Sequence, residues 1–525
     1  MTKLRVGFAG LAALTLGLAP ADAQTSTAIT LRPIGQLATG AAAEIAAYDP
    51  PSRQLFVING TSGGLDVVSL AQPWEPTLVR SIDLRSFGGG ANSVAIRDGL
   101  VAVAVQAETA QNPGRVVFFN SAGQPLASVT VGALPDMLTF TPDGTQVVVA
   151  NEGEPDGYCE AGPTHDPEGS ISVIDLSGGV ATLTDANVRT AGFAAFNGAA
   201  PAGVRIFGPN ATVAQDLEPE YVAVSADSKT AWVTLQENNA LATVDLATAT
   251  VTSLTALGTK DHSRPENALD ASDRDDAARV VPWPVHGVYL PDAIASYRFQ
   301  GHSFLVTANE GDARDYECFG EEERVGGIDL DPIAFPNAET LQEDEQLGRL
   351  RTTSAQGDTD GDGDHDVIYS FGARSFSIWT PAGELVWDSG KDLETITSAA
   401  TPDFFNSDGT GSLDSRSDDK GPEPEGVVVG NFWGRNYAFV GLERTGGIAV
   451  FDVTDPHRPF FVQYAANRLP DGSPAVGTVH DRGPEGLVFI PREDSPNHRA
   501  LLVAAHEVSG TITVFSILPR PLTAP

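Results

Sequence analysis

Basic residues are scarce in this chain. Across 525 residues there are 32 Lys and Arg against 69 Asp and Glu, which gives a formal net charge of -37 at pH 7. Such an excess of negative charge argues against nucleic acid or an anionic membrane surface as a partner. It is compatible with cation binding, or with a soluble protein that works outside the cell.

Long apolar runs are also missing after the first residues. No later stretch reaches the roughly 18 uninterrupted apolar residues that a membrane span needs, so we expect no membrane span. At the start, Lys3 and Arg5 precede an apolar run over residues 6–18, and the small residues 21–23 resemble a cleavage site. This pattern predicts a signal peptide over residues 1–23 and a secreted or periplasmic protein.

Cysteine is nearly absent. Cys159 and Cys318 are the two present, and they follow Asn151 and Asn309 by eight and nine residues. In an oxidising compartment this similar placement favours one disulfide between two loops. A thiolate metal ligand and a pair of unbonded thiols remain the alternatives. The histidines are not spaced as a zinc set, and neither a nucleophile elbow nor a phosphate-binding glycine loop is found.

What the chain does contain is a repeated unit. Runs of about five apolar residues end in an acidic or amide residue, as in VVVANEGE, which ends at Glu154, and in FLVTANEGD, which ends at Asp312. After each run come a loop and a second apolar run, such as GSISVIDL from Gly169. We count seven copies. Repeats of this kind indicate an architecture assembled from one supersecondary unit.

Each copy has a second acidic or amide residue, which opens an earlier short strand. Strand, turn and strand make a hairpin, so the two marked residues of a copy are expected at the same end of it. Twelve of the fourteen positions are Asp or Glu, and the pairs are Glu44/Asn59, Asn92/Glu108, Asp136/Glu152, Glu220/Glu237, Asp292/Glu310, Glu425/Glu443 and Glu485/Glu507.

Seven hairpin-based repeats predict an all-β fold, a single seven-bladed β-propeller over residues 28–519. A strand within residues 28–40 would complete the last blade, because the chain leaves little for a fourth strand there. Such closure removes an exposed sheet edge. Extra residues fall in loop types that open on one face, where function is expected. These insertions cover residues 153–168 and about 186–219, 259–291, 311–366 and 392–424.

The acidic pairs predict a metal site. In a propeller they would ring the mouth of the central channel, where crowded carboxylates raise one another's pKa unless cations neutralise them. Hard oxygen ligands suit Ca²⁺ or Mg²⁺. The alternative is that each acid caps its own blade through backbone N–H groups. The candidate ligands are Glu152, Glu220, Glu237, Asp292, Glu310, Glu425, Glu443, Glu485 and Glu507.

A second candidate is the run DTDGDGDHD. Its acids Asp358, Asp360, Asp362, Asp364 and Asp366 alternate around glycine, as in an EF-hand-type calcium loop. The twelfth position is Tyr where Glu would supply a bidentate ligand, so another ligand must come from elsewhere. The alternative is a merely solvated acidic loop.

The few basic residues beside these acids are candidates for binding an oxyanion. Arg314, Lys420 and Arg444 lie near the acidic signatures. Arg or Lys among metal-bound carboxylates is a composition that binds phosphate. Ordinary salt bridges across the loops are the alternative.

Seven longer segments are distinctive: GALPDMLTFTPDG, VVVANEGEP, DLEPEYVAVS, VTLQENNALATVDL, TANEGDARDY, YSFGARSFSIW and DSRSDDKGPEPEG. On these segments the chain resembles the choice-of-anchor I family over nearly its whole mature length. That family is similar to secreted proteins described as atypical alkaline phosphatases and to mesenchyme-specific cell-surface glycoproteins, and the resemblance implies a YVTN/WD40-like propeller.

Two functions are therefore expected from different classes. One is a metal-dependent phosphoesterase, in which Ca²⁺ and a further divalent or ferric ion act on a small phosphate ester or another oxyanion. The other is a non-catalytic calcium-binding protein of a matrix, a surface or a mineralising tissue. In both, the protein is expected to be a monomer.

Overall fold

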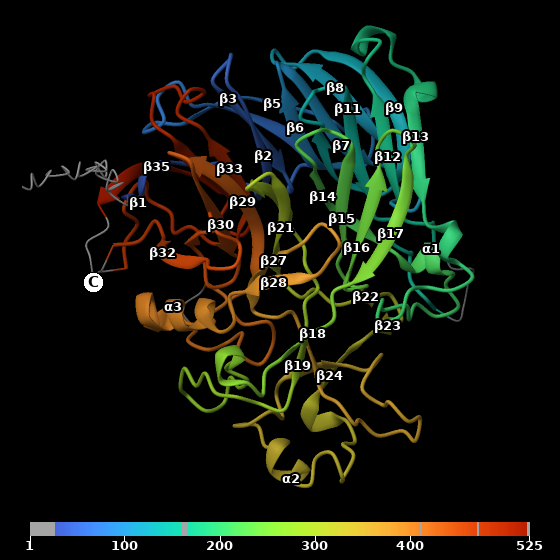
Figure 1. Ribbon diagram of the computed structural model, residues 1–525. Coiled ribbons are helices and arrows are strands. Elements are labelled where there is room, and N and C mark those ends of the chain that lie inside the picture. The colour runs from blue at the N-terminus through green and yellow to red at the C-terminus, as the bar shows by residue number, and fades with distance from the viewer. Residues whose placement is uncertain (1–26, 160–164, 410–411, 470–471, 522–525) are drawn as a thin grey trace, which may run out of the picture.

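The computed structural model describes residues 27–521 except residues 160–164, 410–411 and 470–471. The predicted signal peptide, residues 1–23, lies outside the described residues. Within the described ranges, no helix is long and apolar enough to cross a membrane. The fold is all-β and is built from small antiparallel sheets in the manner of a β-propeller (Figure 1).

The described residues form seven four-stranded antiparallel sheets. The first three are β2 (Ala43–Asp49), β3 (Gln54–Asn59), β4 (Gly64–Ser69) and β5 (Thr77–Ile82); β6 (Gly90–Arg97), β7 (Leu100–Gln106), β8 (Pro113–Asn120) and β9 (Pro125–Ala133); and β10 (Pro135–Phe140), β11 (Gln146–Asn151), β12 (Ser170–Asp175) and β13 (Val188–Gly192).

The other four complete the chain. They are β14 (Pro219–Val224), β15 (Thr230–Leu235), β16 (Ala240–Asp245) and β17 (Thr250–Ala256); β20 (Ile294–Phe299), β21 (His302–Asn309), β27 (Ser375–Trp379) and β28 (Leu385–Asp388); β29 (Pro424–Phe432), β30 (Arg435–Leu442), β31 (Ile448–Asp452) and β32 (Phe460–Ala465); and β33 (Pro484–Ile490), β34 (Leu501–His506), β35 (Thr511–Pro521) and β1 (Thr27–Ala38).

The first strands of consecutive sheets contact one another in a cyclic order. β2 contacts β6, β6 contacts β10, and the series continues through β14, β20, β29 and β33 back to β2. As expected from the sequence, β1 pairs with β35 near the other end of the chain, in a register that runs from Thr27↔Pro521 to Ala38↔Thr511. The N-terminal strand is thus the outer strand of the last sheet.

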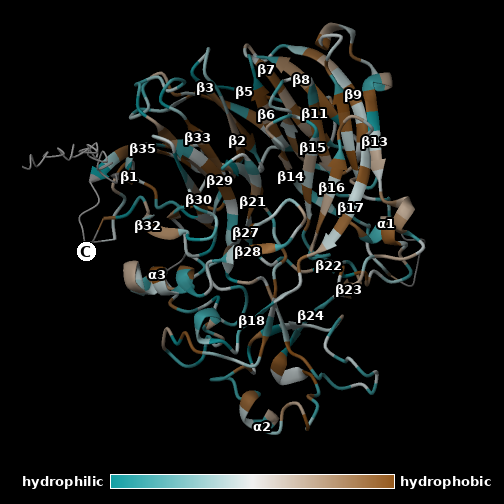
Figure 2. Ribbon diagram, viewed as in Figure 1, coloured by the Kyte–Doolittle hydropathy of each residue, from teal (hydrophilic) through white to brown (hydrophobic). Residues whose placement is uncertain are grey.

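The core lies between neighbouring sheets. Runs of β-branched residues form strands readily and are buried on both faces here, as in β7, whose central residues 101–105 are buried. One cluster joins Phe56 and Val67 of the first sheet to Val103 and Phe119 of the second. Figure 2 shows the hydrophobic residues concentrated in the strands and the hydrophilic ones in the connecting loops.

The long loops gather below the sheets as drawn in Figure 1. They hold short elements: α1 (Val213–Asp216), β18 (Thr259–Asp261), β19 (His286–Val288), β22 (Asp315–Tyr316), β23 (Phe319–Gly320), β24 (Glu322–Arg324), α2 (Ala338–Leu341), β25 (Arg351–Thr353), β26 (Tyr369–Phe371), α3 (Asp392–Ala400) and the 3₁₀ turns Ala194–Phe196, Pro265–Asn267, Val325–Gly327 and Pro402–Phe404. Two further 3₁₀ turns, Val180–Thr182 and Asp185–Asn187, lie in the connection between β12 and β13. A small apolar core that includes Trp283 and Leu350 joins the insertions of residues 259–291 and 311–366.

The loops are fastened to one another. The disulfide joins Cys159 to Cys318 across a Cα–Cα distance of 5.1 Å, which confirms the pairing that the sequence favoured. Arg349 lies 3.0 Å from Asp273 and 3.2 Å from Asp418, so it joins three insertions. One boundary was wrong, because the expected insertion of residues 186–219 includes the short strand β13 near its start. Its sequence, VRTAG, contains Arg, Thr and Gly and so lacks the apolar run used to predict strands.

Candidate functional site

The acidic pairs are positioned by a bulge at the start of the first strand. In four sheets a proline pairs with the last residue of the second strand, and the register then shifts before regular pairing resumes. A bulge turns a side chain away from its regular direction. The paired residues are Pro135↔Asn151, Pro219↔Leu235, Pro424↔Leu442 and Pro484↔His506, and each acid follows directly or within two residues.

The residue before the proline has an unusual backbone. Leu134, Leu290 and Glu423 have positive φ of 46°, 44° and 49°, which is uncommon for residues with a side chain. The carbonyl groups of Leu134 and Glu423 accept the backbone N–H of Glu152 at 2.9 Å and of Glu443 at 2.8 Å. The same bond therefore holds both acids of a pair at one end of their hairpin. Strain of this kind is typical of functional sites.

These residues surround one cavity of about 340 Å³. We name it the acidic funnel. Ten of its lining residues are carboxylates, and two, Lys420 and Arg444, are cations. The lining is Asp136, Glu152, Glu220, Gln236, Asp292, Glu310, Asp312, Lys420, Glu425, Glu443, Arg444, Glu485 and Glu507.

Most of the predicted ligands meet in the funnel. Of the nine predicted glutamates and aspartates of the pairs, Glu237 alone is absent from its lining; it is buried, and its Oε2 has no hydrogen-bond partner among the described residues. The first two copies contribute nothing to the lining, and Glu108 is exposed. Sequence reasoning missed Asp312, although it ends the second Asn-Glu-Gly signature.

Burial and mutual repulsion raise the pKa values of the funnel carboxylates. Burial is the largest cause and neighbouring carboxylates add to it, raising the pKa of Asp136 to about 7 and that of Glu443 to about 8. The pKa values of Glu220, Asp292 and Glu425 rise well above their usual range for the same reasons. A bound cation would relieve this cost.

Two carboxylate triads, one within the funnel and one that adds buried Glu423 beside it, are compact enough to hold an ion. Asp292, Glu310 and Glu425 each offer an oxygen within 4.8 Å of the others, and so do Glu310, Glu423 and Glu443. Oε2 of Glu425 is buried without a hydrogen-bond partner among the described residues. Glu310 belongs to both triads, so it is the central carboxylate of the funnel.

Lys420 makes the two triads differ in net charge. Its Nζ lies 2.8 Å from Glu310 Oε1, 2.8 Å from Asp312 Oδ1 and 3.7 Å from Glu423 Oε2. Burial lowers the pKa of Lys420, but these carboxylates outweigh it and raise the pKa well above its usual value. The ammonium therefore partly neutralises the Glu310–Glu423–Glu443 triad. The Asp292–Glu310–Glu425 triad is the better candidate for a metal ion.

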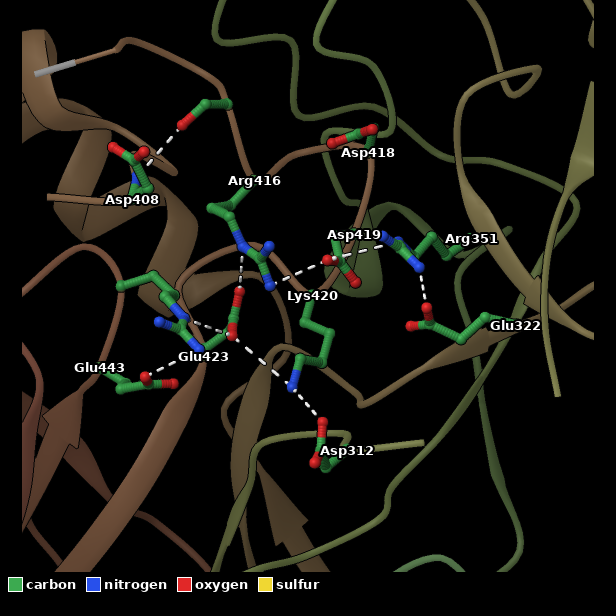
Figure 3. A network of polar contacts seen from close by, with 12 residues as sticks. Asp312, Glu322, Arg351, Asp408, Arg416, Asp418, Asp419, Lys420, Glu423 and Glu443 are labelled. Atoms are coloured by element: carbon green, nitrogen blue, oxygen red, sulfur yellow. Dashed lines mark hydrogen bonds and ion pairs between the residues drawn. The ribbon is translucent and has the colours of Figure 1, made fainter. Parts of the chain in front are cut away.

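Arginines extend this network outward, as Figure 3 shows. Buried Glu423 accepts hydrogen bonds from Arg416 at 2.7 Å and from Arg444 at 3.2 Å. Arg444 also lies 2.9 Å from Glu443. Arg416 pairs with Asp419 at 2.9 Å. No role was predicted for Glu423, because it lies in a loop directly before Pro424 and outside the paired positions.

Arg314 is not in the funnel, contrary to the prediction that it binds substrate. Its side chain is 1% exposed and lies 2.9 Å from Asp216 and 3.2 Å from Glu218. Its Cζ is 4.5 Å from the centroid of the Phe207 ring. Chain proximity to Glu310 was misleading because the loop turns away after Asp312. Arg314 is a buried structural cation.

Replacement of Arg314 by Ala should therefore destabilise the protein. Asp216 and Glu218 would be left buried without their cation, and breaking a buried ion pair costs about 3–5 kcal/mol of unfolding free energy. The measurement is denaturant unfolding beside Arg444→Ala, in which a half-buried guanidinium is lost. A stable Arg314→Ala protein that had lost only ligand affinity would contradict the structural assignment.

The alternating acids of residues 358–366 form an exposed loop. Asp358 accepts the N–H groups of Gly361 at 2.6 Å and Gly363 at 3.0 Å. Asp364 and Asp366 each offer an oxygen within 4.8 Å of one from Asp331. Asp331 lies outside the run of alternating acids. It is therefore a candidate for the additional ligand that was expected from another part of the chain. Its backbone N–H bonds to the His365 carbonyl at 3.1 Å.

The comparisons with known proteins place most of the chain in one family. The profile of the choice-of-anchor I domain matches residues 44–456. Gigasin-3a of Magallana gigas is 32% identical over 201 residues, which are 35% of this chain and 70% of that protein. A mesenchyme-specific cell surface glycoprotein of Strongylocentrotus purpuratus is 29% identical over 200 residues, which are 31% of this chain and 26% of that protein.

Solved structures resemble the chain weakly. Kuenenia stuttgartiensis hydrazine synthase gives a TM-score of 0.45 at 13% identity and covers 91% of this chain and 96% of its own. The WD40 domain of Toxoplasma gondii coronin gives a TM-score of 0.45 at 10% identity, with 94% and 88% covered.

Proposed function

The chain belongs to the choice-of-anchor I family, and from that premise and the acidic funnel we propose that it is an exported, metal-binding, seven-bladed β-propeller that hydrolyses phosphate esters. The observation that carries the proposal is the funnel itself, in which ten carboxylates and two cations line one cavity. The resemblance seen in the sequence to alkaline-phosphatase-like proteins supports the choice of reaction.

The seven-bladed architecture is supported by the strand contacts. Seven four-stranded sheets have first strands that contact one another cyclically, and β1 belongs to the last sheet. We take each sheet as one blade and β1 as the strand that closes the ring. In each blade the first two strands form a hairpin, and the acids at the ends of these hairpins then lie around one central channel.

The funnel suits a hard divalent cation. Asp292, Glu310 and Glu425 supply carboxylate oxygens, the ligands that Ca²⁺ and Mg²⁺ prefer. Among the described residues, the buried Oε2 atoms of Glu220, Glu425 and Glu485 have no hydrogen-bond partner, so they are available as ligand atoms. When bound, such an ion supplies a Lewis acid for a phosphoryl oxygen.

The cations of the funnel are placed to receive an oxyanion. Lys420 and Arg444 are held beside Glu310 and Glu443 by ion pairs of 2.8 and 2.9 Å. Neutralising the carboxylates would leave these side chains free to donate to non-bridging phosphoryl oxygens. Arg444 is the more accessible of the two, because its side chain is 35% exposed while that of Lys420 is 7% exposed.

The experiment that tests the proposal is an assay of the purified protein on p-nitrophenyl phosphate and its bis ester. Bound metal is measured on the same sample. Chelation should abolish turnover, and restoring the metal should recover it. A protein that binds metal but hydrolyses neither ester with Ca²⁺, Mg²⁺, Mn²⁺, Fe³⁺ or Zn²⁺ would refute the enzymatic part.

The loop of residues 358–366 is proposed as a separate calcium site. Asp331, Asp364 and Asp366 would bind the ion, while the two hydrogen bonds to Asp358 shape the loop. The order of alternating acids and glycines is typical of calcium loops.

Replacing both Asp331 and Asp364 by Asn should lower the calcium content by one ion per chain. It should also reduce the rise in melting temperature on adding Ca²⁺, because binding to the native state stabilises it by mass action. Asp329→Asn is the matched control, since Asp329 is exposed and lies just before the site. Calcium content equal to that of the control would leave the loop a solvated turn.

A second candidate function is a non-catalytic calcium-binding surface or matrix protein. The observation in its favour is that Lys420 and Arg444 are already paired with carboxylates, as structural cations are. The relative from Strongylocentrotus purpuratus is described as a cell surface glycoprotein. The hydrolysis assay separates the two functions.

An extracellular or surface location is proposed for both functions. The Cys159–Cys318 disulfide fits an oxidising compartment. The printed description of the sea-urchin relative points the same way. A cell fractionation that located the protein in a reducing compartment would contradict it.

A further inference from the structure

A separate acidic cluster lies between two insertions. Asp270, Asp275 and Asp414 each offer a carboxylate oxygen, and these oxygens lie within 4.8 Å of one another. Asp270 is 1% exposed and Asp414 is 3% exposed. None of the three lines the acidic funnel. Carboxylates so deeply buried need a partner, because burying an uncompensated charge is costly.

The local chain fixes these side chains firmly. A bridge between Leu269 and Val281 closes the first loop. Within this loop Asp270 Oδ2 accepts the backbone N–H of Arg279, and Asp275 Oδ1 accepts that of Ala277 at 3.2 Å. Such bonds hold the carboxylates in place and leave other lone pairs unused.

Asp414 reaches the cluster from the insertion of residues 392–424. Its φ of 70° is left-handed, and its N–H bonds to the Phe405 carbonyl at 2.9 Å. Its Oδ1 accepts the hydroxyl of Ser417. The cluster thus joins two insertions that are far apart in the sequence.

One oxygen of Asp414 has no hydrogen-bond donor. Oδ2 of Asp414 is buried and has no hydrogen-bond partner among the described residues. The same is true of Oδ1 of Asn406. Asn406 belongs to the same loop, because its backbone carbonyl accepts the N–H of Arg416, two residues after Asp414. Buried polar atoms are nearly always hydrogen-bonded, so each exception needs an explanation. A bound cation is such an explanation, because it uses oxygen lone pairs without needing a donor.

The nearby arginines neutralise the cluster only in part, although the charge of Arg374 opposes the rise in the pKa of Asp414. Arg374 binds Glu394 at 2.8 Å and donates to the backbone carbonyl of Asp270. Arg279 is 3.9 Å from Asp275 and stacks on Trp283. Burial first, then the charges of Asp414 and Glu394, raise the pKa of Asp270 to about 8. The carboxylates therefore repel one another in the absence of a cation.

We propose that Asp270, Asp275 and Asp414 form a structural site for a hard divalent cation, Ca²⁺ above all, that clamps the insertion of residues 259–291 to that of residues 392–424. Carboxylate oxygens in an irregular loop setting are the ligands that Ca²⁺ accepts. Asp414 lies six residues before Lys420 on the same loop. The clamp therefore fixes the segment that carries Lys420 into the funnel.

The test is the Asp414→Asn variant, examined with and without Ca²⁺. In chelator it should melt higher than wild type, by roughly 2 °C, because one of the mutually repelling charges is gone. With saturating Ca²⁺ it should bind one ion fewer per chain and gain less in melting temperature. A general packing defect would lower the melting temperature in both conditions, so opposite signs identify a ligand.

Two further variants keep the test decisive. Asp276→Asn removes the same charge from an exposed neighbour in the loop and should match wild type. Asp275→Asn repeats the test at the half-buried ligand if Asp414→Asn fails to fold. Wild-type calcium content and wild-type thermal gain in the variant that folds would overturn the proposal. Asp292→Asn, in the funnel, should leave the clamp ion in place, so failure of the funnel and failure of the clamp are distinguishable.

Discussion

Phosphoesterase turnover should be lost when Glu310 is replaced by Gln. Glu310 belongs to both carboxylate triads and bonds Lys420 at 2.8 Å and Gln236 at 2.9 Å. Gln keeps the size and can accept one of these two hydrogen bonds through its single side-chain oxygen, but it removes the charge that a cation needs. Replacing a residue that contacts a metal ligand typically lowers metal affinity or activity about 10–100-fold. Replacing a ligand itself should therefore lower turnover more than about 100-fold.

Arg444→Ala probes the oxyanion side of the same cavity. Removing a charge-assisted contact should weaken substrate binding by about 1.5–3 kcal/mol, seen as a higher KM. The double variant with Glu310→Gln should show less than the summed loss, because both changes act at one place. The measurement is kcat and KM for the two single variants and the double, with bound metal and thermal stability.

Glu108→Gln is the matched control for the funnel. Glu108 is a member of a predicted pair, but it is exposed and outside the cavity. Its replacement should change neither turnover nor metal content. If the Glu310 and Arg444 variants both retain wild-type turnover, the funnel does not catalyse hydrolysis and its carboxylates have a structural role.

Deletion of residues 27–40 should have the largest effect on folding. β1 pairs along β35 over its whole length, and Ile29 and Leu31 are buried against Phe515 and Ile517. Without β1, the edge of β35 and this apolar cluster would be exposed, which favours aggregation. We expect insoluble protein, or loss of a cooperative thermal transition.

A peptide of residues 27–40 offers a direct control. Added to the truncated protein, it can restore the missing strand by edge pairing, whereas a scrambled peptide should not. A truncated protein that melts like the full-length chain would show that β1 does not close the structure.

The repeated signature made the fold and most of the funnel predictable. Pro135-Asp136 and Pro424-Glu425 open first strands, and Asn151-Glu152 ends a second strand, because hairpin geometry depends on local sequence. The bulges and the left-handed residues before the prolines turn the acids toward one cavity. These backbone features do not change the apolar pattern of the sequence, so only the structure revealed them. Position along the strand was enough to identify eight of the ten carboxylates that line the cavity.

Loop residues were predicted less well, since their contacts come from distant segments. Arg314 lies four residues after Glu310 yet binds Asp216, which is 98 residues away. Asp331 meets the acids of residues 358–366 through a parallel bridge between Leu330 and His365. Glu423 is held by three cations from its own and a neighbouring loop. None of these pairings has a periodic signal in the chain.

The disulfide also determines what a protease can release. Cys159 and Cys318 are 159 residues apart and enclose the fourth sheet together with the exposed loop around Arg274. A single cut anywhere between them leaves one covalent molecule, which separates into two fragments only after reduction. A protein that is nicked in this loop would therefore run as one molecule on a denaturing gel without reductant and as two fragments after reduction.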